Sequence, residues 1–267
     1  NENDPSDARS LLAYYNREQY PGVDSPVYGA YYSNSFSSAS IEKDDKPKYE
    51  KNYKTGKYVI VNYFKGALQG SDPKHMGLLP RMWSEQHAEN YMRYYGPLEF
   101  RIKNEYLDSE ELKTTVGQFK NGLAKGEIDE AAYISFLREF RDYIEVLPPS
   151  IMDNLRYMFD FQFNYMYWRY FMWNFTGKQD DIQGRYDKHG NWLSGLSFLD
   201  SPRLGTQENL PADILDNKGR NTYFFLPLLL GVIGILFQFK KDKKQFWALF
   251  VFFMFTGLAI QFYTNPY

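Results

Sequence analysis

Four basic side chains stand beside aromatic or apolar sequence and are the residues best suited to hold an anion. They are Arg169, Lys178, Arg203 and Arg220. Guanidinium and ammonium groups bind phosphate oxygens through charge-assisted hydrogen bonds, so this set predicts a phosphate site at a membrane surface. The alternative is that each cation extends its charged end into water or pairs with a neighbouring carboxylate.

A second set of residues has the chemistry to contact a sugar or an acceptor. Tryptophan rings can stack on a sugar face, although the same rings also anchor proteins at a membrane interface. A histidine or a carboxylate can hydrogen-bond to hydroxyl groups, and either can equally serve packing alone. The candidates are Trp83, His87, Trp173, Asp180 and Trp192.

Several common chemistries have no signature in this sequence. The patterns of a phosphate-binding loop, a dinucleotide fold, a zinc protease and a serine hydrolase elbow do not occur. The chain has no cysteine and three scattered histidines, so we expect neither a thiolate nucleophile nor a metal site. The net charge of −2, without a basic stripe, gives no support for nucleic-acid binding.

Two apolar runs near the end of the chain determine where the rest of it can lie. They cover residues 223–239 and 246–263, 17 and 18 residues without a charge, and predict a transmembrane helical hairpin over residues 223–263. Four lysines lie in the short link 240–245, which indicates a cytoplasmic link. Residues 1–222 would then be extracytoplasmic or periplasmic, on an inner-membrane protein. A hairpin buried inside a soluble protein is the alternative.

Residues 150–177 predict one long helix of unusual composition. Ser150 and Asp153 form a capping box, and Gly177 provides the stop. Eleven of the nineteen residues in 157–175 are aromatic, but Asp160 and Arg169 interrupt them. This pattern favours an interfacial helix on the outer leaflet, with a tilted third span as the alternative.

The remaining chain completes a mainly α membrane protein with an extracytoplasmic α+β region. Residues 1–149 form the α+β domain, in which residues 46–64 predict a small β-hairpin that turns at residues 54–56. Asp108 with Glu111, and Asp129, mark the starts of two helices separated by Gly126. Residues 178–222 are read as extracytoplasmic loops, where a site is commonly found. Neither end resembles a natural terminus, so we expect a fragment of a longer membrane protein.

The ordered blocks of this sequence resemble glycosyltransferase family 117, the protein O-mannosyltransferase-like membrane proteins. The resemblance covers nearly the whole chain and rests on DARSLLAYYNREQYPG, PRMWSEQHAENY, WRYFMWNFTGKQDDIQG, GNWLSG, RLGTQENLP, RNTYFFLPLLLGVIG, the lysine-rich link and FFMFTGLAI. Where the family usually carries Arg-Gln-Asn-Asp after the aromatic helix, this chain has Lys-Gln-Asp-Asp at 178–181. That departure leaves the role of the loop open.

The resemblance implies a C-type glycosyltransferase fold, with a lipid-phosphate-linked sugar as donor, a protein as acceptor and no bound cofactor in this segment. It implies transfer of a sugar to protein hydroxyl groups on the extracytoplasmic side, and the family's name indicates that this sugar is mannose. A carboxylate on an external loop upstream of this segment would serve as the base, so no catalytic residue is assigned here. The alternative is a non-catalytic envelope protein whose aromatic external domain binds a glycan or a partner.

Overall fold

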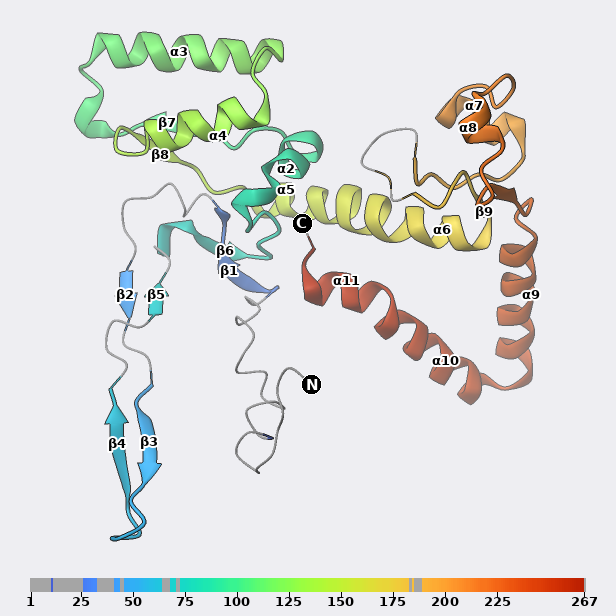
Figure 1. Cartoon of the computed structure of the whole chain (residues 1–267), viewed down its shortest axis with the longest axis horizontal. Helices are drawn as coiled ribbons and strands as arrows, with labels where there is room; N and C mark the ends of the chain where they lie inside the picture. Colours follow the sequence, from blue (N-terminus) through green and yellow to red (C-terminus); the bar gives the residue numbers. More distant parts are fainter. Residues whose placement is uncertain are drawn as a thin grey trace. The chain divides into compact units, whose positions relative to one another are not determined.

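The computed structural model describes residue 11 and residues 26–32, 41–43, 46–63, 68–70, 73–182, 184 and 189–266. The chain divides into two compact units, residues 1–154 and 155–266, here called unit 1 and unit 2. About 55% of the structure is helical and the sheets are small, which confirms the mainly α prediction (Figure 1).

Unit 1 contains short antiparallel strand pairs. β1 (Tyr28–Ala30) pairs with β6 (Met76–Leu78), and β2 (Ile41–Lys43) pairs with β5 (Leu68–Gly70). β3 (Lys48–Lys51) pairs with β4 (Tyr58–Asn62), and β7 (Phe100–Ile102) pairs with β8 (Ile144–Val146). The first three pairs are therefore nested around the β3–β4 hairpin, and no described sheet in this unit has more than two strands.

The helices of unit 1 lie between its later strands in the sequence. Short 3₁₀ turns η2 (Pro73–His75), η3 (Glu85–His87) and η4 (Asn104–Tyr106) accompany α2 (Ala88–Tyr94), α3 (Glu110–Lys125) and α4 (Glu130–Glu139). Asp129 caps α4 by accepting from Ala132 N at 2.8 Å, as predicted. The cap of α3 is Ser109, which accepts from Leu112 N, so the prediction of Asp108 was wrong by one residue.

The core of unit 1 is built largely from aromatic rings. Tyr32 stacks on Tyr91 with ring centroids 5.2 Å apart, and the buried Tyr133 donates its hydroxyl hydrogen to Leu98 O at 2.9 Å. The fully buried Asn154 accepts from Arg81 N at 3.2 Å and donates to the Tyr31 hydroxyl at 2.7 Å. This amide therefore joins three separate segments of unit 1, because both ends of its side chain are used.

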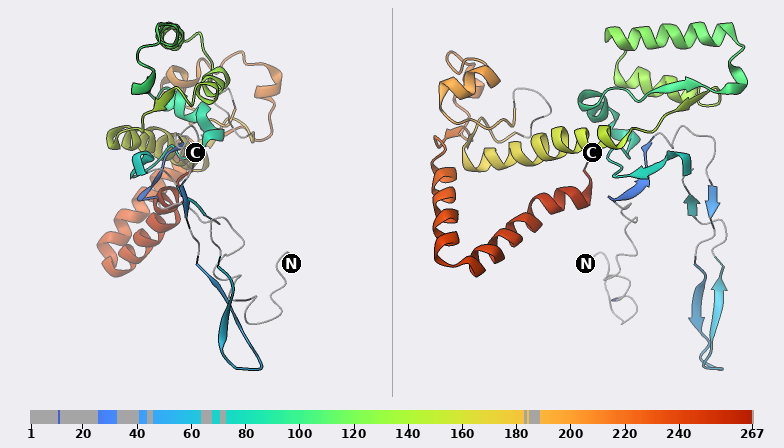
Figure 2. Two further views of the ribbon diagram at one scale, coloured as in Figure 1. Left: turned by 90° about the vertical axis from the view of Figure 1, so that its left-hand side faces the viewer. Right: turned by 180° about the vertical axis from the view of Figure 1, so that it is seen from behind.

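The predicted β-hairpin is present and lies outside this core. Asn52 and Lys57 close it: Asn52 N donates to Lys57 O and Gly56 N donates to Asn52 O, both at 2.8 Å. Gly56 has φ +68°, the left-handed conformation that glycine adopts without strain. In Figures 1 and 2, β3 and β4 extend as a ribbon beyond the other described elements of unit 1.

The long aromatic helix is one continuous rod in three parts. α5 (Ile151–Tyr157) leads into a π-helical stretch, η5 (Met158–Trp168), which is followed by α6 (Arg169–Phe175). The capping box is confirmed, because Ser150 N donates to the Asp153 carboxylate at 3.0 Å and Asp153 N donates to the Ser150 hydroxyl at 3.3 Å. In the π-helical stretch the hydrogen bonds span five residues, as from Arg169 N to Asn164 O.

Unit 2 continues through small elements to three apolar helices. β9 (Gly177–Lys178) pairs with β10 (Asn221–Thr222), and α7 (Ser197–Leu204) and α8 (Ala212–Leu215) lie between them in sequence. α9 (Leu226–Lys241), α10 (Lys243–Thr256) and α11 (Leu258–Thr264) complete the described chain. None of these three helices has a buried residue, so they do not form the interior of a soluble hairpin.

The structure corrects the prediction of two membrane spans. Within the described residues, one helical segment is long and apolar enough to cross a membrane: Lys243–Thr264, 22 residues with mean hydropathy 1.8. α9 has 16 residues and ends in Lys240 and Lys241, so its length is roughly 24 Å against about 30 Å for a bilayer core. It starts late because Phe224 and Phe225 adopt left-handed backbone angles, with φ of 50° and 60°.

The lysine-rich link is also shorter than predicted. α9 continues through Lys241, and α10 begins at Lys243, so Asp242 alone joins the two helices. The Asp242 carboxylate accepts from Lys244 N at 3.0 Å and from Gln245 N at 3.1 Å. Because this cap satisfies the first amides of α10, the second helix starts directly after the first one ends.

Two sets of hydrogen bonds join the aromatic helix to the ends of the apolar helices. In the middle of the helix, the buried Gln162 amide donates to Asn265 Oδ1 at 2.9 Å and to Pro266 O at 2.7 Å, just after α11. At its end, Thr176 O accepts from Tyr223 N at 2.9 Å, just before α9. η5 and α6 therefore extend from the end of α11 to the start of α9 (Figure 1).

Candidate anion-binding site

Three chain segments meet at the end of the aromatic helix and form the base of the candidate site. Lys178 on β9 pairs with Asn221 on β10 and also forms an isolated bridge with Trp192. Gly177 makes this meeting possible, because it has φ +132° and a Cβ built there would lie 2.7 Å from Asn221 O. Lys178 and Asn221, which are 43 residues apart in the sequence, thus lie side by side.

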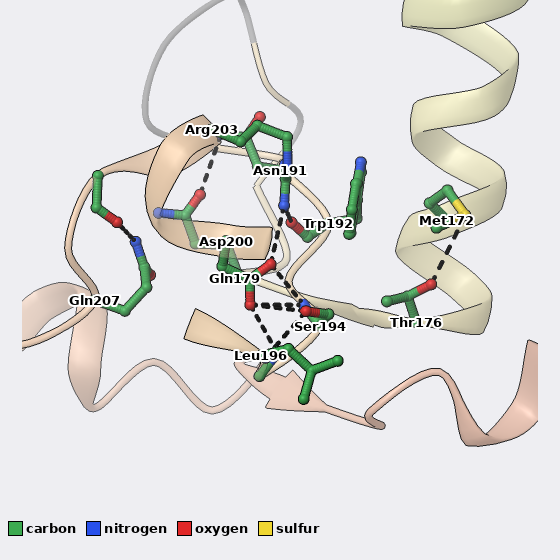
Figure 3. Close-up of polar contacts among 12 residues, drawn as sticks. Met172, Thr176, Gln179, Asn191, Trp192, Ser194, Leu196, Asp200, Arg203 and Gln207 are labelled. Carbon is green, nitrogen blue, oxygen red and sulfur yellow. Dashed lines mark hydrogen bonds and ion pairs between the residues drawn. The ribbon is translucent and has the colours of Figure 1, made fainter. Parts of the chain in front are cut away.

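A buried carboxylate organises the loop that carries Trp192. Asp200 is 1% exposed and accepts from Ser194 N at 3.1 Å, the Ser194 hydroxyl at 3.0 Å and Gly195 N at 2.8 Å (Figure 3). It also accepts from Arg203 Nη2 at 3.3 Å. These four donors compensate for the burial of the carboxylate and fix the loop against α7.

Arg203 is engaged by this loop on three sides. Its guanidinium carbon lies 3.6 Å from the centroid of the Trp192 ring, and Nη2 donates to Trp192 O at 2.6 Å as well as to Asp200. Burial lowers the pKa of Arg203, and the nearby Asp200 carboxylate acts in the opposite direction. Arg203 therefore positions Trp192, and its Nη2 donates within the chain.

Arg169 and Lys178 are likewise partnered within unit 2. Arg169 Nε donates to Tyr165 O at 3.1 Å, Nη1 donates to Gly190 O, and the guanidinium lies 4.6 Å from the Tyr165 ring centroid. Lys178 pairs with Asp181 and lies 4.7 Å from the Trp173 ring centroid. Both arrangements match the alternative stated for these cations, that each pairs with neighbouring groups of the chain. The ammonium group of Lys178 is still partly exposed.

Arg220 differs from these three cations. Its Nη2 donates to Gln207 Oε1 at 3.0 Å, whereas its buried Nη1 has no hydrogen-bond partner within the described part of the chain. Arg220 directly precedes Asn221, the strand partner of Lys178. A buried guanidinium nitrogen without an acceptor is costly, so it indicates a position for an acceptor from outside the chain.

Trp173 provides a second unsatisfied donor in the same unit. Its indole Nε1 is buried and, among the described residues, has no acceptor. The ring lies under the Lys178 ammonium, four residues before Gly177. Trp173, Lys178 and Arg220 thus all belong to segments that meet at the β9–β10 pair, and all three are hydrogen-bond donors without an acceptor function.

Asp180 and His189 form a separate pair that closes the neighbouring loop. The Asp180 side chain is 3% exposed, and its Oδ2 lies 2.7 Å from His189 Nδ1. Its Oδ1 accepts from Gly190 N at 3.0 Å and from Ile182 N at 3.1 Å. Because all these partners belong to the loop itself, Asp180 orients this loop rather than presenting a carboxylate for acceptor contact.

The other predicted residues are placed differently. Trp192 lies in unit 2, half-buried and 6.2 Å from Phe225 between ring centroids. Trp83 and His87 belong to unit 1, where burial lowers the pKa of His87. Within the described residues there is no group of three or more side chains suited to hold a metal ion.

Sequence reasoning missed the residues that determine which cations are available. Asp200, Ser194 and Gln207 were not among the predicted residues. Asp200 accepts from Arg203 and from Ser194 in the Trp192 loop, and Gln207 accepts from one nitrogen of Arg220. A weak signal was present, because Asp and Ser near a helix start often accept backbone hydrogen bonds. Their partners lie 3 to 13 residues away, and the fold brings each pair together.

In comparison with known proteins, the chain matches a family model described as a family of unknown function, DUF8416. The model matches residues 22–159, which is just over half of the 267 residues. The chain belongs to the DUF8416 family. The matched region covers the described part of unit 1 apart from residue 11, together with the first residues of the aromatic helix. It ends before β9 and the candidate site. Neither a curated protein nor a solved structure matches the chain.

Proposed function

We propose that this chain is a segment of a membrane glycosyltransferase that takes a sugar, mannose, from a lipid-phosphate donor and transfers it to protein hydroxyl groups on the extracytoplasmic side. The observation that carries the proposal is the unsatisfied guanidinium nitrogen of Arg220, six residues before the apolar helix α9 begins. A donor whose phosphate lies at a membrane surface matches this position, because guanidinium groups bind phosphate oxygens well.

The arrangement of unit 2 supports a membrane surface at this level. The aromatic helix contacts the end of α11 through Gln162 and the start of α9 through Thr176. These residues are 14 positions apart, a distance of roughly 20 Å along a helix. A helix that meets both ends of an apolar hairpin in this way is suited to lie in the plane of the outer leaflet, and its tyrosines and tryptophans favour that depth.

The lysines around Asp242 support the orientation. Lys240, Lys241, Lys243 and Lys244 all lie at the opposite end of α9 and α10 from Arg220. A bias of lysine toward the cytoplasm then places the candidate site and residues 1–222 outside, in an inner-membrane protein. By length α9 falls short of a bilayer core, so this orientation requires the bilayer to thin locally where α9 crosses it.

An apolar groove between α9 and α10 offers a place for the lipid part of the donor. It has a volume of about 400 Å³ and is lined by Gly231, Gly234, Ile235, Gln238, Phe246, Leu249, Phe250 and Phe253. The two glycines leave open space on the α9 face, where an added Cβ would meet no atom within 4 Å. An isoprenoid or acyl chain fits a groove of this character better than a polar ligand does.

The base of the reaction is expected upstream of this chain. Of the buried carboxylates described, Asp180 and Asp200 are fully engaged with loop amides and side chains, so neither is placed to accept a proton from an acceptor hydroxyl. The role proposed for this segment is therefore donor binding: Arg220 and Lys178 stabilise the phosphate as the sugar leaves, which is electrostatic stabilisation of the developing negative charge.

Binding of a polyprenyl-phosphate mannose to the chain in lipid nanodiscs tests the proposal directly. We expect Arg220→Gln to weaken binding on the order of tenfold or more, since a hydrogen bond to a charged group is lost. Lys218→Gln is the matched control, because Lys218 is exposed in the same loop and the charge change is equal. Unchanged binding in Arg220→Gln would remove this residue from the site, and no binding by the unaltered chain would sink the proposal.

Two further measurements address topology and the missing base. The chain has no cysteine, so single cysteines introduced at Asp108 and Lys243 can be labelled one at a time. The first should react from the extracytoplasmic side and the second from the cytoplasmic side, and reversed labelling would overturn the orientation. The chain alone should transfer no mannose, and measurable transfer would show that the base lies within it.

A further inference from the structure

The β3–β4 hairpin of unit 1 exposes an apolar surface that the rest of the chain does not cover. Every residue of both strands is exposed. Tyr53 at the tip is 93% exposed and Tyr58 is 70% exposed, and the run Val59, Ile60 and Val61 is exposed as well. A two-stranded hairpin with no core is marginally stable in water, so such a surface indicates a role outside the fold of unit 1.

The apolar residues occupy both faces of this ribbon. Tyr49 pairs with Ile60 and Lys51 pairs with Tyr58, and residues two apart in a strand share a face, so these four lie together. Val59 pairs with Glu50 on the opposite face. A protein partner covering one face would leave the other face in water, whereas insertion into a lipid interface covers both.

The charge of the hairpin is opposite to that of the remainder of the chain. Residues 46–63 contain five lysines and one glutamate, a net charge of +4, in a chain whose net charge is −2. Two of the lysines, Lys54 and Lys57, flank the tyrosine-bearing tip. A cationic segment that alternates lysine with tyrosine and aliphatic residues is complementary to an anionic phospholipid surface, because lysine stems can lie along apolar surface while the ammonium groups reach the phosphates.

We infer that the β3–β4 hairpin docks on an anionic phospholipid surface, with Tyr53 and the tip at the level of the headgroups. This inference does not depend on the proposed transferase activity. The rigid tip suits this role, because the hydrogen bonds of Asn52 with Gly56 and Lys57 hold the turn in one conformation. Tyrosine is favoured at the headgroup level, and each lysine near an anionic surface strengthens docking about fivefold.

A fluorophore at the tip tests the inference in the full chain. Tyr53→Cys provides the sole thiol for an environment-sensitive dye, and the exposure of Tyr53 makes the substitution structurally mild. The labelled chain is reconstituted in bilayers of neutral phosphatidylcholine and in bilayers with about 30% phosphatidylglycerol. We expect a blue shift and quenching by lipids spin-labelled near the headgroup in the anionic bilayers, with a much smaller docked fraction in the neutral ones.

Charge substitutions separate docking from nonspecific contact. Lys54→Gln with Lys57→Gln should lower the ratio of docked to free tips roughly 25-fold. Lys113→Gln with Lys125→Gln is the matched control, because these lysines are exposed on α3 of the same unit and the charge change is equal. The control should dock as the unaltered chain does, and an equal loss in both double variants would overturn a specific role for the hairpin.

Other outcomes would also refute the inference. A dye that remains in water in the anionic bilayers would exclude lipid as the occupant. A spectral shift that grows with the number of chains per vesicle, without quenching by spin-labelled lipid, would assign the surface to a second copy of the chain. Circular dichroism of each variant checks that the fold is retained, so a loss of signal cannot be mistaken for unfolding.

Discussion

Removal of the Asp200 carboxylate should release the loop that carries Trp192. In the folded chain this carboxylate accepts from Ser194 N, the Ser194 hydroxyl, Gly195 N and Arg203. Asp200→Ala leaves these donors unsatisfied, and leaves Arg203 as a partly buried cation without its counter-charge. Breaking a buried ion pair lowers the free energy of unfolding by about 3–5 kcal/mol. Because Arg203 is partly exposed, we expect the lower end of this range, about 3 kcal/mol, for Asp200→Ala.

Amide hydrogen exchange in nanodiscs measures this cost locally. A loss of about 3 kcal/mol corresponds to exchange on the order of 100-fold faster at the Ser194 and Gly195 amides. The fluorescence of Trp192 should also change, since Arg203 no longer stacks on it. Asp216→Asn is the control, because Asp216 is exposed in the same unit and should change exchange by less than about threefold. Unchanged exchange of the two amides in Asp200→Ala would refute the organising role of the carboxylate.

Three smaller predictions concern other positions. Gln162→Leu removes the hydrogen bonds to Asn265 and Pro266 and should lower the free energy of unfolding of unit 2 by about 1–2 kcal/mol, measured by thermal unfolding; no change would show that this contact is dispensable. Gly177→Ala places a Cβ against backbone atoms and should lower the free energy of unfolding by more than about 2 kcal/mol. Gly205→Ala has open space around it and should lower this free energy by about 1 kcal/mol, so equal losses in the two variants would contradict the packing described. Burial lowers the pKa of His87 in the folded state, so unit 1 should lose a little stability as the pH falls below about 6.5, and a His87→Gln variant that keeps the same pH dependence would exclude His87 as the cause.

Local signals were read correctly where the determinants lie within one turn of helix. The capping box of Ser150 and Asp153, the cap at Asp129 and the left-handed Gly126 with φ 72° follow from side chains and backbone three residues apart or fewer. The same logic explains the error at Asp108, since the adjacent Ser109 has an equally good cap acceptor. Composition alone cannot distinguish two neighbouring caps.

The ends of the apolar helices were less predictable from hydropathy. The apolar run includes Phe224 and Phe225, but both adopt positive φ, because Phe224 N bonds back to Ser194 O and Tyr223 N bonds to Thr176 O. These partners lie 30 or more residues away and have no signature in the run itself. Hydropathy therefore overestimated the number of helices long enough to span a bilayer, although it located the apolar segment correctly.

The candidate site was predictable as a set of residue types but not as a set of available groups. The sequence marked Arg169, Lys178, Arg203 and Arg220 together, and the structure shows that all four have partners, while Arg220 also has a buried nitrogen without one among the described residues. Asp200 and Asp181 lie three residues from Arg203 and Lys178, whereas the carbonyl of Gly190 lies 21 residues from Arg169 and Gln207 lies 13 residues from Arg220. Only the fold distinguishes a cation that supports a loop from one that retains an unsatisfied nitrogen.

The anchoring of the aromatic helix at two points has a consequence for how its length can vary. Gln162 must meet Asn265 while Thr176 meets Tyr223, and the stretch between them is helical throughout. One inserted or deleted residue in α6 would turn Thr176 by roughly 100° about the axis and displace it by about 1.5 Å. The number of residues in this stretch therefore cannot change without detaching one end of the apolar helices.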